Sequence, residues 1–315
     1  MKVLLTGATG FLGSQVLASL IAAEDEVVAL RRPRTDRTIK PSITPSGRPQ
    51  VTLVDGDLRD AARLAAIFRD HRPDAVVHLA WFTQHGAYWT AVENLDCVGD
   101  GLQLLRLAAE HGCRRFLGAG TCAEYDWSHD LLVETRTPCV PRTLYGAAKL
   151  ALFLVAERFA AQAGMSFAWA RYGFLFGPGE AAGRLVSAAI ESLSAGADFA
   201  CSAGAQVRDF VHVDEAAAAT AALLHSEVSG AVNIGSGEPV SVRQLIETLA
   251  DLVAARHGTS GRPRFGALPT RPDDPAALIL DLARLRNEVG WRLQLPLLQA
   301  LASTVECVGA KGRPS

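Results

Sequence analysis

The sequence has almost no net charge, and it has no apolar run long enough to cross a bilayer. Its 31 Lys and Arg stand against 33 Asp and Glu, which leaves a formal charge of −2. No global positive field therefore exists to attract nucleic acid or an anionic membrane. No apolar stretch approaches the ~20 residues that cross a bilayer, and the first residues form a strand pattern instead of a secretion signal. We expect a cytoplasmic protein without nucleic-acid or membrane partners.

Closely spaced cysteines are also absent. The six cysteines lie far apart and none is part of a C-x-x-C pair. They are Cys97, Cys113, Cys122, Cys139, Cys201 and Cys307. This spacing predicts no metal site and no small disulfide framework. Reduced thiols are typical of the cytosol.

Short apolar runs alternate with longer amphipathic or Ala-rich stretches. We predict strands at Lys2–Thr6, Glu26–Leu30, Val51–Val54, Ala75–Leu79, Arg115–Gly118 and Ser166–Tyr172. Helices are predicted at Phe11–Ala23, Asp60–Asp70, Leu102–His111 and Leu144–Gln162. Continuous hydrophobicity within the strands favours a parallel sheet that is covered on both faces. The predicted fold is α/β, a doubly wound parallel sheet of the Rossmann type with a smaller C-terminal substrate-binding lobe.

A Gly-Pro turn at 176–179 ends the regular alternation. We predict a dinucleotide-binding domain over residues 1–175, with returning segments near 207–235. The smaller substrate-binding lobe is predicted over 176–206 and 236–315. Residues 31–50 are rich in Arg and Pro, and apart from the first two we interpret them as a solvated loop.

A glycine-rich turn follows the first strand, with the spacing G-x-x-G-x-x-G and a helix after it. Glycines let the backbone approach a pyrophosphate, whose charge is met by free N–H groups and the positive end of the helix dipole. The predicted cofactor contacts are Gly7, Thr9, Gly10, Phe11, Leu12 and Gly13. The alternative is a plain glycine-rich turn, but the strand before it and the helix after it favour dinucleotide binding.

The end of the second strand bears on the choice between NADH and NADPH. An acid there would bind the ribose 2′-hydroxyl, but this chain has Arg31 and Arg32. Guanidinium groups suit a 2′-phosphate, so we predict NADP (NADPH), with NAD as the other possibility. After the third strand, Asp57 and Leu58 are placed to meet the adenine ring. The alternative is an Asp that caps the next helix.

Tyr145 and Lys149 lie four residues apart in an Ala-rich helical pattern. Residues at this spacing share a helix face, so the phenol and the ammonium group can point into one cleft. A nearby cation favours the charged form of the phenol and moves its pKa down toward working pH. We expect Tyr145 to exchange a proton with a carbonyl or alcohol oxygen.

Together these motifs resemble the short-chain dehydrogenase/reductase superfamily, and within it the extended NAD(P)-dependent epimerase/dehydratase branch that acts on nucleotide-activated sugars. The resemblance covers nearly the whole chain. It rests on residues 6–13, 55–58, 78–80, 120–125, 145–149, 177–179, 208–214 and 271–275.

The resemblance implies a role for each matching position. Thr121 would hydrogen-bond the substrate oxygen, Tyr145 would donate the proton, and Lys149 would bind the nicotinamide ribose. Arg208 and Arg271 would bind the pyrophosphate of the sugar nucleotide. Further cofactor contacts are placed at Leu79 and Ala80, and further substrate contacts at Trp81 and Cys122. The helices near 92–111 and 144–162 stand where relatives form a homodimer.

Three departures from the family pattern bear on the reaction. Cys122 and Ala123 replace the acidic pair of the sugar dehydratases, so an elimination lacks its acid and base. Cys97 stands near the position of the family's helix Asn, with Asn94 one turn earlier, which leaves the proton relay behind Lys149 open. Arg31 replaces the acid that is typical of epimerases with tightly held NAD.

These departures favour reduction by NADPH of the 4-keto group of a nucleotide-linked 4-keto-6-deoxyhexose, as in deoxysugar biosynthesis. The first alternative is a nucleotide-sugar 4-epimerase with tightly bound NAD. The second is a non-catalytic NADP-sensing protein, although such proteins typically lose the Tyr and Lys that this chain keeps. A third is a reductase of small carbonyl compounds, against which Arg208 and Arg271 argue.

Aromatic side chains crowd the loop after the fourth predicted strand. They are Trp81, Phe82, Tyr88 and Trp89, with His85 among them. This loop lies at the carboxyl end of the sheet, where open α/β folds bind ligands. The side chains either line the sugar pocket or pack the loop onto the sheet, and His85 is either an additional acid or a solvated residue.

Overall fold

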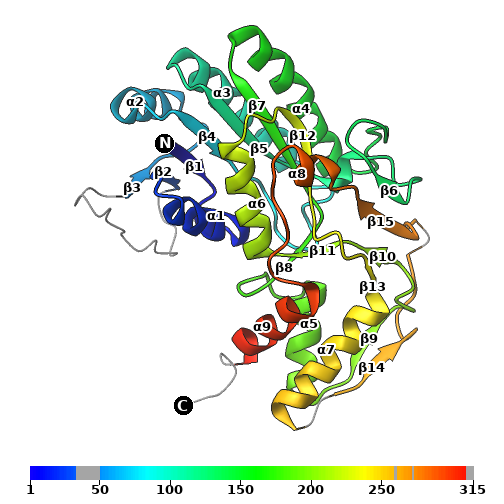
Figure 1. Cartoon of the computed structure of the whole chain (residues 1–315). Coiled ribbons are helices and arrows are strands. Elements are labelled where there is room, and N and C mark those ends of the chain that lie inside the picture. The colour runs from blue at the N-terminus through cyan, green and yellow to red at the C-terminus, as the bar shows by residue number, and fades with distance from the viewer. Residues whose placement is uncertain (33–49, 259–260, 272, 310–315) are drawn as a thin grey trace.

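A seven-stranded parallel sheet forms the centre of the larger part of the molecule, as the computed structural model in Figure 1 shows. The structure describes residues 1–32, 50–258, 261–271 and 273–309, so most of the predicted loop at 31–50 lies outside the described residues. The strands are β1 (Lys2–Thr6), β2 (Glu26–Arg31), β3 (Val51–Asp55), β4 (Ala75–His78), β5 (Arg115–Thr121), β7 (Ser166–Tyr172) and β12 (Gly230–Ile234). Their order, β12-β7-β5-β4-β1-β2-β3, is that of a doubly wound sheet. The predicted fold class is confirmed.

The strands form where apolar residues run without interruption. β4 is buried at all four of its positions, and β5 at all seven. A strand buried on both faces needs apolar side chains at every position instead of every second one. The register pairs β1 with β2 on one side and with β4 on the other, in parallel in both cases. The carboxyl ends of these strands therefore meet at one edge of the sheet.

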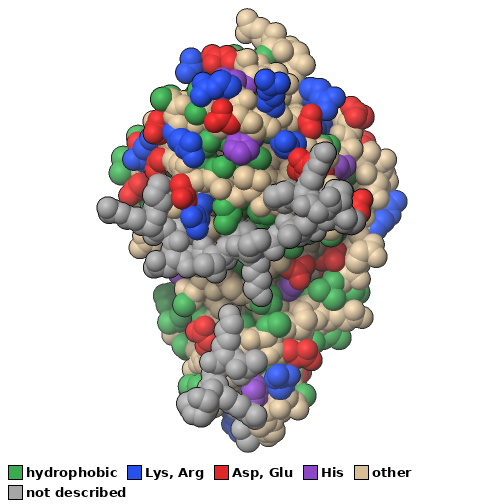
Figure 2. Space-filling view, turned by 90° about the vertical axis from the view of Figure 1, so that its left-hand side faces the viewer, with side chains coloured by type: hydrophobic (Ala, Val, Ile, Leu, Met, Phe, Trp, Pro, Cys, Tyr) green, Lys and Arg blue, Asp and Glu red, His purple; other side chains and the backbone are tan. Residues whose placement is uncertain are grey.

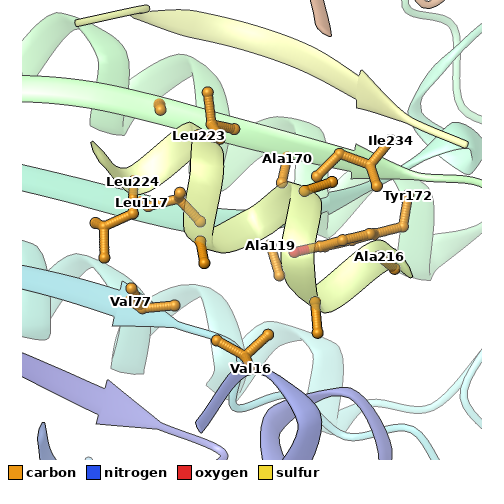
Figure 3. Close-up of a cluster of buried hydrophobic side chains, with 14 of the residues drawn as sticks. Val16, Val77, Leu117, Ala119, Ala170, Tyr172, Ala216, Leu223, Leu224 and Ile234 are labelled. Carbon is orange, nitrogen blue, oxygen red and sulfur yellow. The ribbon is translucent and has the colours of Figure 1, made fainter. Parts of the chain in front are cut away.

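Helices cover both faces of the sheet. The helices of the larger part are α1 (Phe11–Ala22), α2 (Ala61–His71), α3 (Glu93–Glu110), α4 (Leu144–Ala163) and α6 (Val213–His225). One buried cluster joins α1 and α6 to the sheet, and a second joins α2, α3 and α4 to its opposite face. Figure 3 shows part of the first cluster, to which Leu223 and Leu224 of α6 and Leu117 of β5 belong. Burial of these apolar faces stabilises the layered arrangement.

Two of the predicted helices begin at a different residue from the observed ones. α3 begins at Glu93, close to the start near 92 that the family resemblance implies and nine residues before the start at Leu102 that the apolar pattern predicts. The sequence hides this because Gly99 and Gly101 lower helix propensity. Tertiary packing explains one of them, since a Cβ at Gly101 would lie 2.6 Å from Cδ2 of Leu152 on α4. The other helix, α2, begins at Ala61 because the side chain of Asp60 accepts the N–H of Arg63 as its cap.

A smaller lobe has a hydrophobic core of its own. Its helices are α5 (Leu185–Ser194), α7 (Val242–His257) and α9 (Leu297–Gly309), whose buried faces form a third cluster. A four-stranded sheet in the order β13-β10-β15-β6 consists of Val240–Ser241, Val207–Arg208, Ala277–Leu280 and Leu131–Leu132. Smaller pairings join β8 (Phe174–Phe176) to β11 (Phe210–His212) and β9 (Phe199–Cys201) to β14 (Pro263–Phe265). The remaining helices are the 3-10 helix η1 (Cys122–Glu124) and α8 (Ala283–Asn287).

The chain crosses between the two parts more than once. Leu278, Leu280 and Leu285 pack into the same cluster as α1 and α6 of the larger part, although the sequence placed this segment in the smaller lobe. The domain boundaries stay a prediction.

The visible surface in Figure 2 carries Lys and Arg side chains interspersed with Asp and Glu side chains. Within the described ranges, no helix has the length and hydropathy to cross a membrane.

Candidate active site

The candidate site is a cavity of about 1130 Å³ at the carboxyl ends of the strands. The strand order reverses between β1 and β4, the position at which ligands bind in open α/β sheets. Of the residues selected from sequence, the cavity is lined by Gly7, Thr9, Gly10, Phe11, Leu12, Gly13, Arg32, Asp57, Leu58, Leu79, Ala80, Trp81, Thr121, Cys122, Tyr145, Lys149, Arg208 and Arg271. The fold thus brings these residues to one place. Which ligand each of them contacts stays a prediction.

The glycine turn has the tight packing that the sequence predicts. A Cβ at Gly7 would lie 2.8 Å from the backbone N of Ala80, and one at Gly13 only 2.0 Å from the carbonyl oxygen of Gly7. Gly7 also has φ +77, a conformation that glycine adopts without strain. The N-cap residue Gly10 gives α1 no side-chain cap, and the N–H groups of a first turn lack partners within the helix. Both observations fit a bound pyrophosphate.

The two arginines after β2 differ in position. Arg31 pairs with Asp55 at the end of β3, with Nε 2.9 Å from Oδ1, and this hydrogen bond lowers the pKa of the Asp55 carboxyl. Leu30 and Arg32 line the cavity, but Arg31 is not among the described residues that do. Arg32 is therefore the better placed of the two predicted phosphate contacts.

Asp57 is available to a ligand because another residue caps α2. The capping side chain is that of Asp60. Asp57 lines the cavity next to Leu58, and its Oδ1 accepts the N–H of Arg59 at 3.0 Å. The structure thus excludes the capping alternative for Asp57, and its contact with the adenine ring stays a prediction.

Thr121, Tyr145 and Lys149 meet at the junction of β5 and α4. α4 begins after Thr143, whose hydroxyl accepts the N–H of Gly146 at 3.1 Å. A Cβ at Gly146 would lie 2.3 Å from the carbonyl oxygen of Ala123, so the missing side chain lets α4 approach η1. Across this close contact the hydroxyl of Thr121 comes near enough to the phenol of Tyr145 to act on its pKa.

Burial lowers the pKa of Lys149 to about 7. Its Nζ donates to the carbonyl oxygen of Ala119 at 2.6 Å and lies 3.6 Å from the ring centroid of Trp81. The negative charge of Glu124 opposes the effect of burial on this pKa. The ammonium group thus has an acceptor, an aromatic face and a nearby carboxylate to stabilise it.

The expected lowering of the Tyr145 pKa is wrong. Burial raises this pKa, and the nearby phenol of Tyr88 raises it further, while the nearby hydroxyl of Thr121 acts against the shift. Desolvation disfavours a phenolate more than the sequence pattern suggests. Tyr145 is therefore a protonated phenol, which suits a proton donor.

Aromatic rings surround Tyr145 on several sides. The ring centroids of Tyr88 and Trp89 lie 5.0 and 5.7 Å from that of Tyr145, both edge to face. Trp127 stacks edge to face on Trp89 at 6.2 Å. All of them line the cavity, so the loop aromatics belong to the pocket wall, whereas His85 is exposed and is not among the described lining residues.

This chain differs from the family at the helix position of the family's Asn, where it has Cys97, with Asn94 one turn earlier. Asn94 is fully buried and its Oδ1 accepts the indole N–H of Trp81 at 2.8 Å. Cys97 lines the cavity, and burial raises the pKa of its thiol. Asn94 therefore orients the ring that covers Lys149 and does not itself contact the lysine.

Arginines of the smaller lobe reach the other end of the cavity. Arg208 is buried and pairs with Asp274, and Arg271 and Arg184 also line the cavity. Arg184 had no signal in the sequence, since a lone Arg after a Gly-rich turn is typical of a surface loop. In the described part of the chain, no group of three or more His, Cys, Asp or Glu side chains is placed to hold a metal ion.

Comparison with known proteins decides the family. The model of the NAD dependent epimerase/dehydratase family matches residues 3–235. This chain belongs to that family. The match confirms the resemblance that the sequence motifs carried.

Relatives within the epimerase/dehydratase family span the whole chain. The UDP-glucose 4-epimerase of Azospirillum brasilense is 29% identical over 347 aligned positions, which cover 99% of this chain and 95% of that protein. The dTDP-glucose 4,6-dehydratase of Actinoplanes sp. is 26% identical, with 97% of each chain covered. Among solved structures, the UDP-glucose 4-epimerase of Thermus thermophilus in complex with NAD is 26% identical, covers 99% of both chains and has a TM-score of 0.80.

Proposed function

We propose that this protein is an enzyme that binds a nicotinamide dinucleotide and a nucleotide-diphosphate sugar and exchanges hydrogen at C4 of the sugar. The observation that carries the proposal is the convergence of Thr121, Tyr145 and Lys149 on the cavity that the glycine turn also lines. Family membership and the relatives' cofactor, NAD, support the same conclusion.

The cofactor would be held by the glycine turn, by Asp57 and Leu58 at the adenine, and by Tyr145 and Lys149 at the nicotinamide ribose. A bound nicotinamide dinucleotide supplies hydride transfer. Burial of Lys149 keeps its ammonium in a water-poor site, where a charge interacts more strongly with a ligand than in bulk water.

The chain's own groups act on the C4 oxygen of the sugar. Tyr145, as the phenolate, accepts the proton of the C4 hydroxyl when hydride leaves C4, and as the phenol it donates this proton back when hydride returns. The hydroxyl of Thr121 orients the C4 oxygen. Proton exchange by a placed side chain typically contributes 10²–10⁴-fold. Donors fixed before the reaction stabilise charge on the oxygen without reorganisation.

The sugar nucleotide's diphosphate would bind Arg208, Arg271 and Arg184. Guanidinium groups suit phosphate oxygens because they present several N–H donors in one plane. Asp274 holds Arg208 in place through an ion pair. The sugar then lies between these arginines and the aromatic wall.

The relatives favour 4-epimerisation as the net reaction, over the reduction that the sequence suggested. Several of the most similar curated proteins are 4-epimerases. Incubation of the purified protein with UDP-glucose or UDP-galactose and NAD tests this. We expect the two epimers to equilibrate without net formation of NADH, and an unchanged sugar would count against it.

Dehydration is disfavoured by the residues beside Thr121. Cys122 is buried, and burial raises the pKa of its thiol to about 12. A thiol with this pKa is a poor base near neutral pH. The neighbouring Ala123 has no titratable group, so the site lacks the pair that an elimination needs.

NADPH-dependent reduction of a 4-keto-6-deoxyhexose is the second candidate. One observation favours it: Arg31 and Arg32 follow β2, and Arg32 lines the cavity. Loss of NADPH absorbance with a panel of 4-keto-6-deoxy sugar nucleotides tests the reaction. Arg31→Asp combined with Arg32→Ser is expected to lower the preference for NADPH over NADH at least tenfold, about the effect of one charge-assisted hydrogen bond. An unchanged preference would contradict the cofactor assignment.

A homodimer through α3 and α4 is part of the proposal. The two helices pack side by side, and each has strongly exposed apolar side chains. Val92 and Leu95 of the α3 region are 67% and 58% exposed, and Leu154 and Val155 of α4 are 52% and 51% exposed. A second copy of the same face would bury these side chains.

A further inference from the structure

A buried cluster of Glu124, Trp169 and Arg171, which we name the Glu124 cluster, lies directly behind Thr121. Glu124 is fully buried, and its Oε1 accepts the backbone N–H of Thr121 at 2.8 Å and the indole N–H of Trp169 at 2.9 Å. Its Oε2 accepts the Nε–H of Arg171 at 2.7 Å. Three donors, one from the end of β5 and two from β7, thus converge on one carboxylate, which takes no part in the proton exchange at C4.

The sequence makes room for this cluster with two glycines of β5. A Cβ at Gly120 would lie 2.2 Å from Nε1 of Trp169 and 2.6 Å from Oε1 of Glu124. A Cβ at Gly118 would lie 2.3 Å from the ring of Trp169. Because a side chain at either position would displace the indole or the carboxylate, the strand before Thr121 is shaped around the cluster.

Charge within the cluster is balanced by Arg171. Its side chain is 2% exposed. Its Cζ lies 4.6 Å from the ring centroid of Tyr125 and 5.0 Å from that of Phe153. Burial by itself lowers the pKa of Arg171, but the facing carboxylate of Glu124 outweighs this and the pKa is raised. The ion pair is buried, and removal of one partner would leave an uncompensated buried charge, which costs much more than the intact pair.

The carboxylate of Glu124 also acts on the lysine of the site. The charged and titratable groups around Lys149 are Glu124 from η1, Cys97 from α3, His78 from β4 and Tyr145 on α4 itself. Of these, Glu124 is the largest opposing influence on the lowered pKa of Lys149. Around Glu124 itself stand Arg171, Tyr125, Cys122, Cys139, Tyr145 and Lys149.

We propose that Glu124 is a positioning residue for the C4 reaction, which fixes the backbone of Thr121 and holds a buried carboxylate on the side of the site where Lys149 lies. The inference rests on the proposed function. Thr121 begins a capping box with Glu124, so the hydroxyl that faces Tyr145 and the N–H that Glu124 accepts belong to one rigid turn. Trp169 and Arg171 hold the carboxylate in the position from which it binds the backbone of Thr121 and acts on Lys149.

Glu124→Gln tests the charge with little change in shape. We expect kcat to fall about 10- to 100-fold, because bonds to charged groups are worth more than neutral ones, while KM for the nucleotide sugar changes less than about twofold. Without the carboxylate the pKa of Lys149 falls, so the alkaline limb of the pH profile moves to lower pH. Glu124→Asp keeps the charge, so we expect the alkaline limb of its pH profile near that of the wild type, although its kcat is lower.

Arg115→Met is the matched control. Arg115 is a buried arginine at the opposite end of β5, where it donates to the carbonyl oxygens of Leu223 and Val228. Its loss is expected to lower Tm and to leave the pH profile in place. A folded Glu124→Gln with the wild-type kcat and pH limb would overturn the proposal.

Two further measurements keep the test decisive. If Glu124→Gln does not fold, Glu124→Gln with Arg171→Met removes both charges together and is expected to show the same shift of the limb. An unshifted alkaline limb in the pH profile of that double variant overturns the proposal.

The second measurement is the pH dependence of NADH or NADPH binding, followed by nicotinamide fluorescence. It reports on Lys149 in the absence of a sugar. Wild-type protein that binds the dinucleotide but converts no nucleotide sugar refutes the proposed function alone, and an unshifted binding profile in Glu124→Gln refutes the role of Glu124.

Discussion

Burial sets the chemistry of the two central residues in opposite ways. It removes water from the phenol of Tyr145 and raises its pKa, and it lowers the pKa of Lys149 to about 7. Both shifts favour the uncharged form, as expected for groups that leave water. The site therefore holds a proton firmly on the tyrosine and loosely on the lysine. The ammonium of Lys149 is lost as pH rises through about 7, so activity that needs this charge is expected to decline above that pH.

Tyr145→Phe is expected to lower kcat by about 10²–10⁴-fold, because it removes the proton donor and leaves the ring packing intact. Turnover of the active nucleotide sugar is the measurement, with circular dichroism to check the fold. Tyr125→Phe is the control, since Tyr125 is fully buried, is not among the described residues that line the cavity, and donates its hydroxyl to Oδ1 of Asn233 at 2.7 Å. Equal turnover of Tyr145→Phe and the wild type would exclude the proposed proton transfer.

The elements that position the site are the turn between β1 and α1 and the junction of β5, η1 and α4. Each depends on a glycine where a side chain would collide with backbone, Gly13 in the first case and Gly146 in the second. Such positions can be recognised in the sequence only as glycines at a suggestive spacing. The structure shows which atoms forbid a side chain there.

Gly13→Ala is expected to weaken dinucleotide binding and to lower the free energy of unfolding by about 1–3 kcal/mol, the usual cost of overpacking. The reason is that its Cβ would lie 2.0 Å from the carbonyl oxygen of Gly7. Gly99→Ala is the control, because no atom lies within 4 Å of a Cβ there and Ala favours a helix by up to about 1 kcal/mol. Chemical denaturation and a cofactor titration measure both effects. A Gly13→Ala protein as stable and as tightly binding as the wild type would contradict the argument.

The whole molecule completes the cavity by folding its smaller lobe against the edge of the sheet. Arg208, Arg271 and Arg184 come from segments far from the glycine turn in sequence, yet they line the same cavity. The outer face of α3 and α4 remains apolar and exposed, which places the proposed dimer contact away from the strand ends.

Leu95→Glu combined with Val155→Glu is expected to convert the proposed dimer to a monomer, because two charges would be buried at the proposed contact. Sedimentation velocity measures the oligomeric state. Leu298→Glu is the control, since Leu298 on α9 is 60% exposed and lies in the smaller lobe. A wild-type monomer, or a dimer that survives the double substitution, would refute this interface.

The sequence by itself determined the parallel sheet, the glycine turn and the pairing of Tyr145 with Lys149. These features depend on local patterns: uninterrupted apolar runs, a fixed glycine spacing, and two residues on one helix face. Confirmation of the fold and the family shows that such patterns were sufficient at this level.

Only the tertiary structure decided the pKa direction of Tyr145, the engagement of Arg31 by Asp55, the place of Arg184 in the cavity and the role we propose for Glu124. Each depends on groups that are distant in the chain. Glu124, for example, meets Trp169 and Arg171, which lie 45 and 47 residues away. Burial and ion pairing are properties of the packed molecule, because they are set by which side chains displace water around a group.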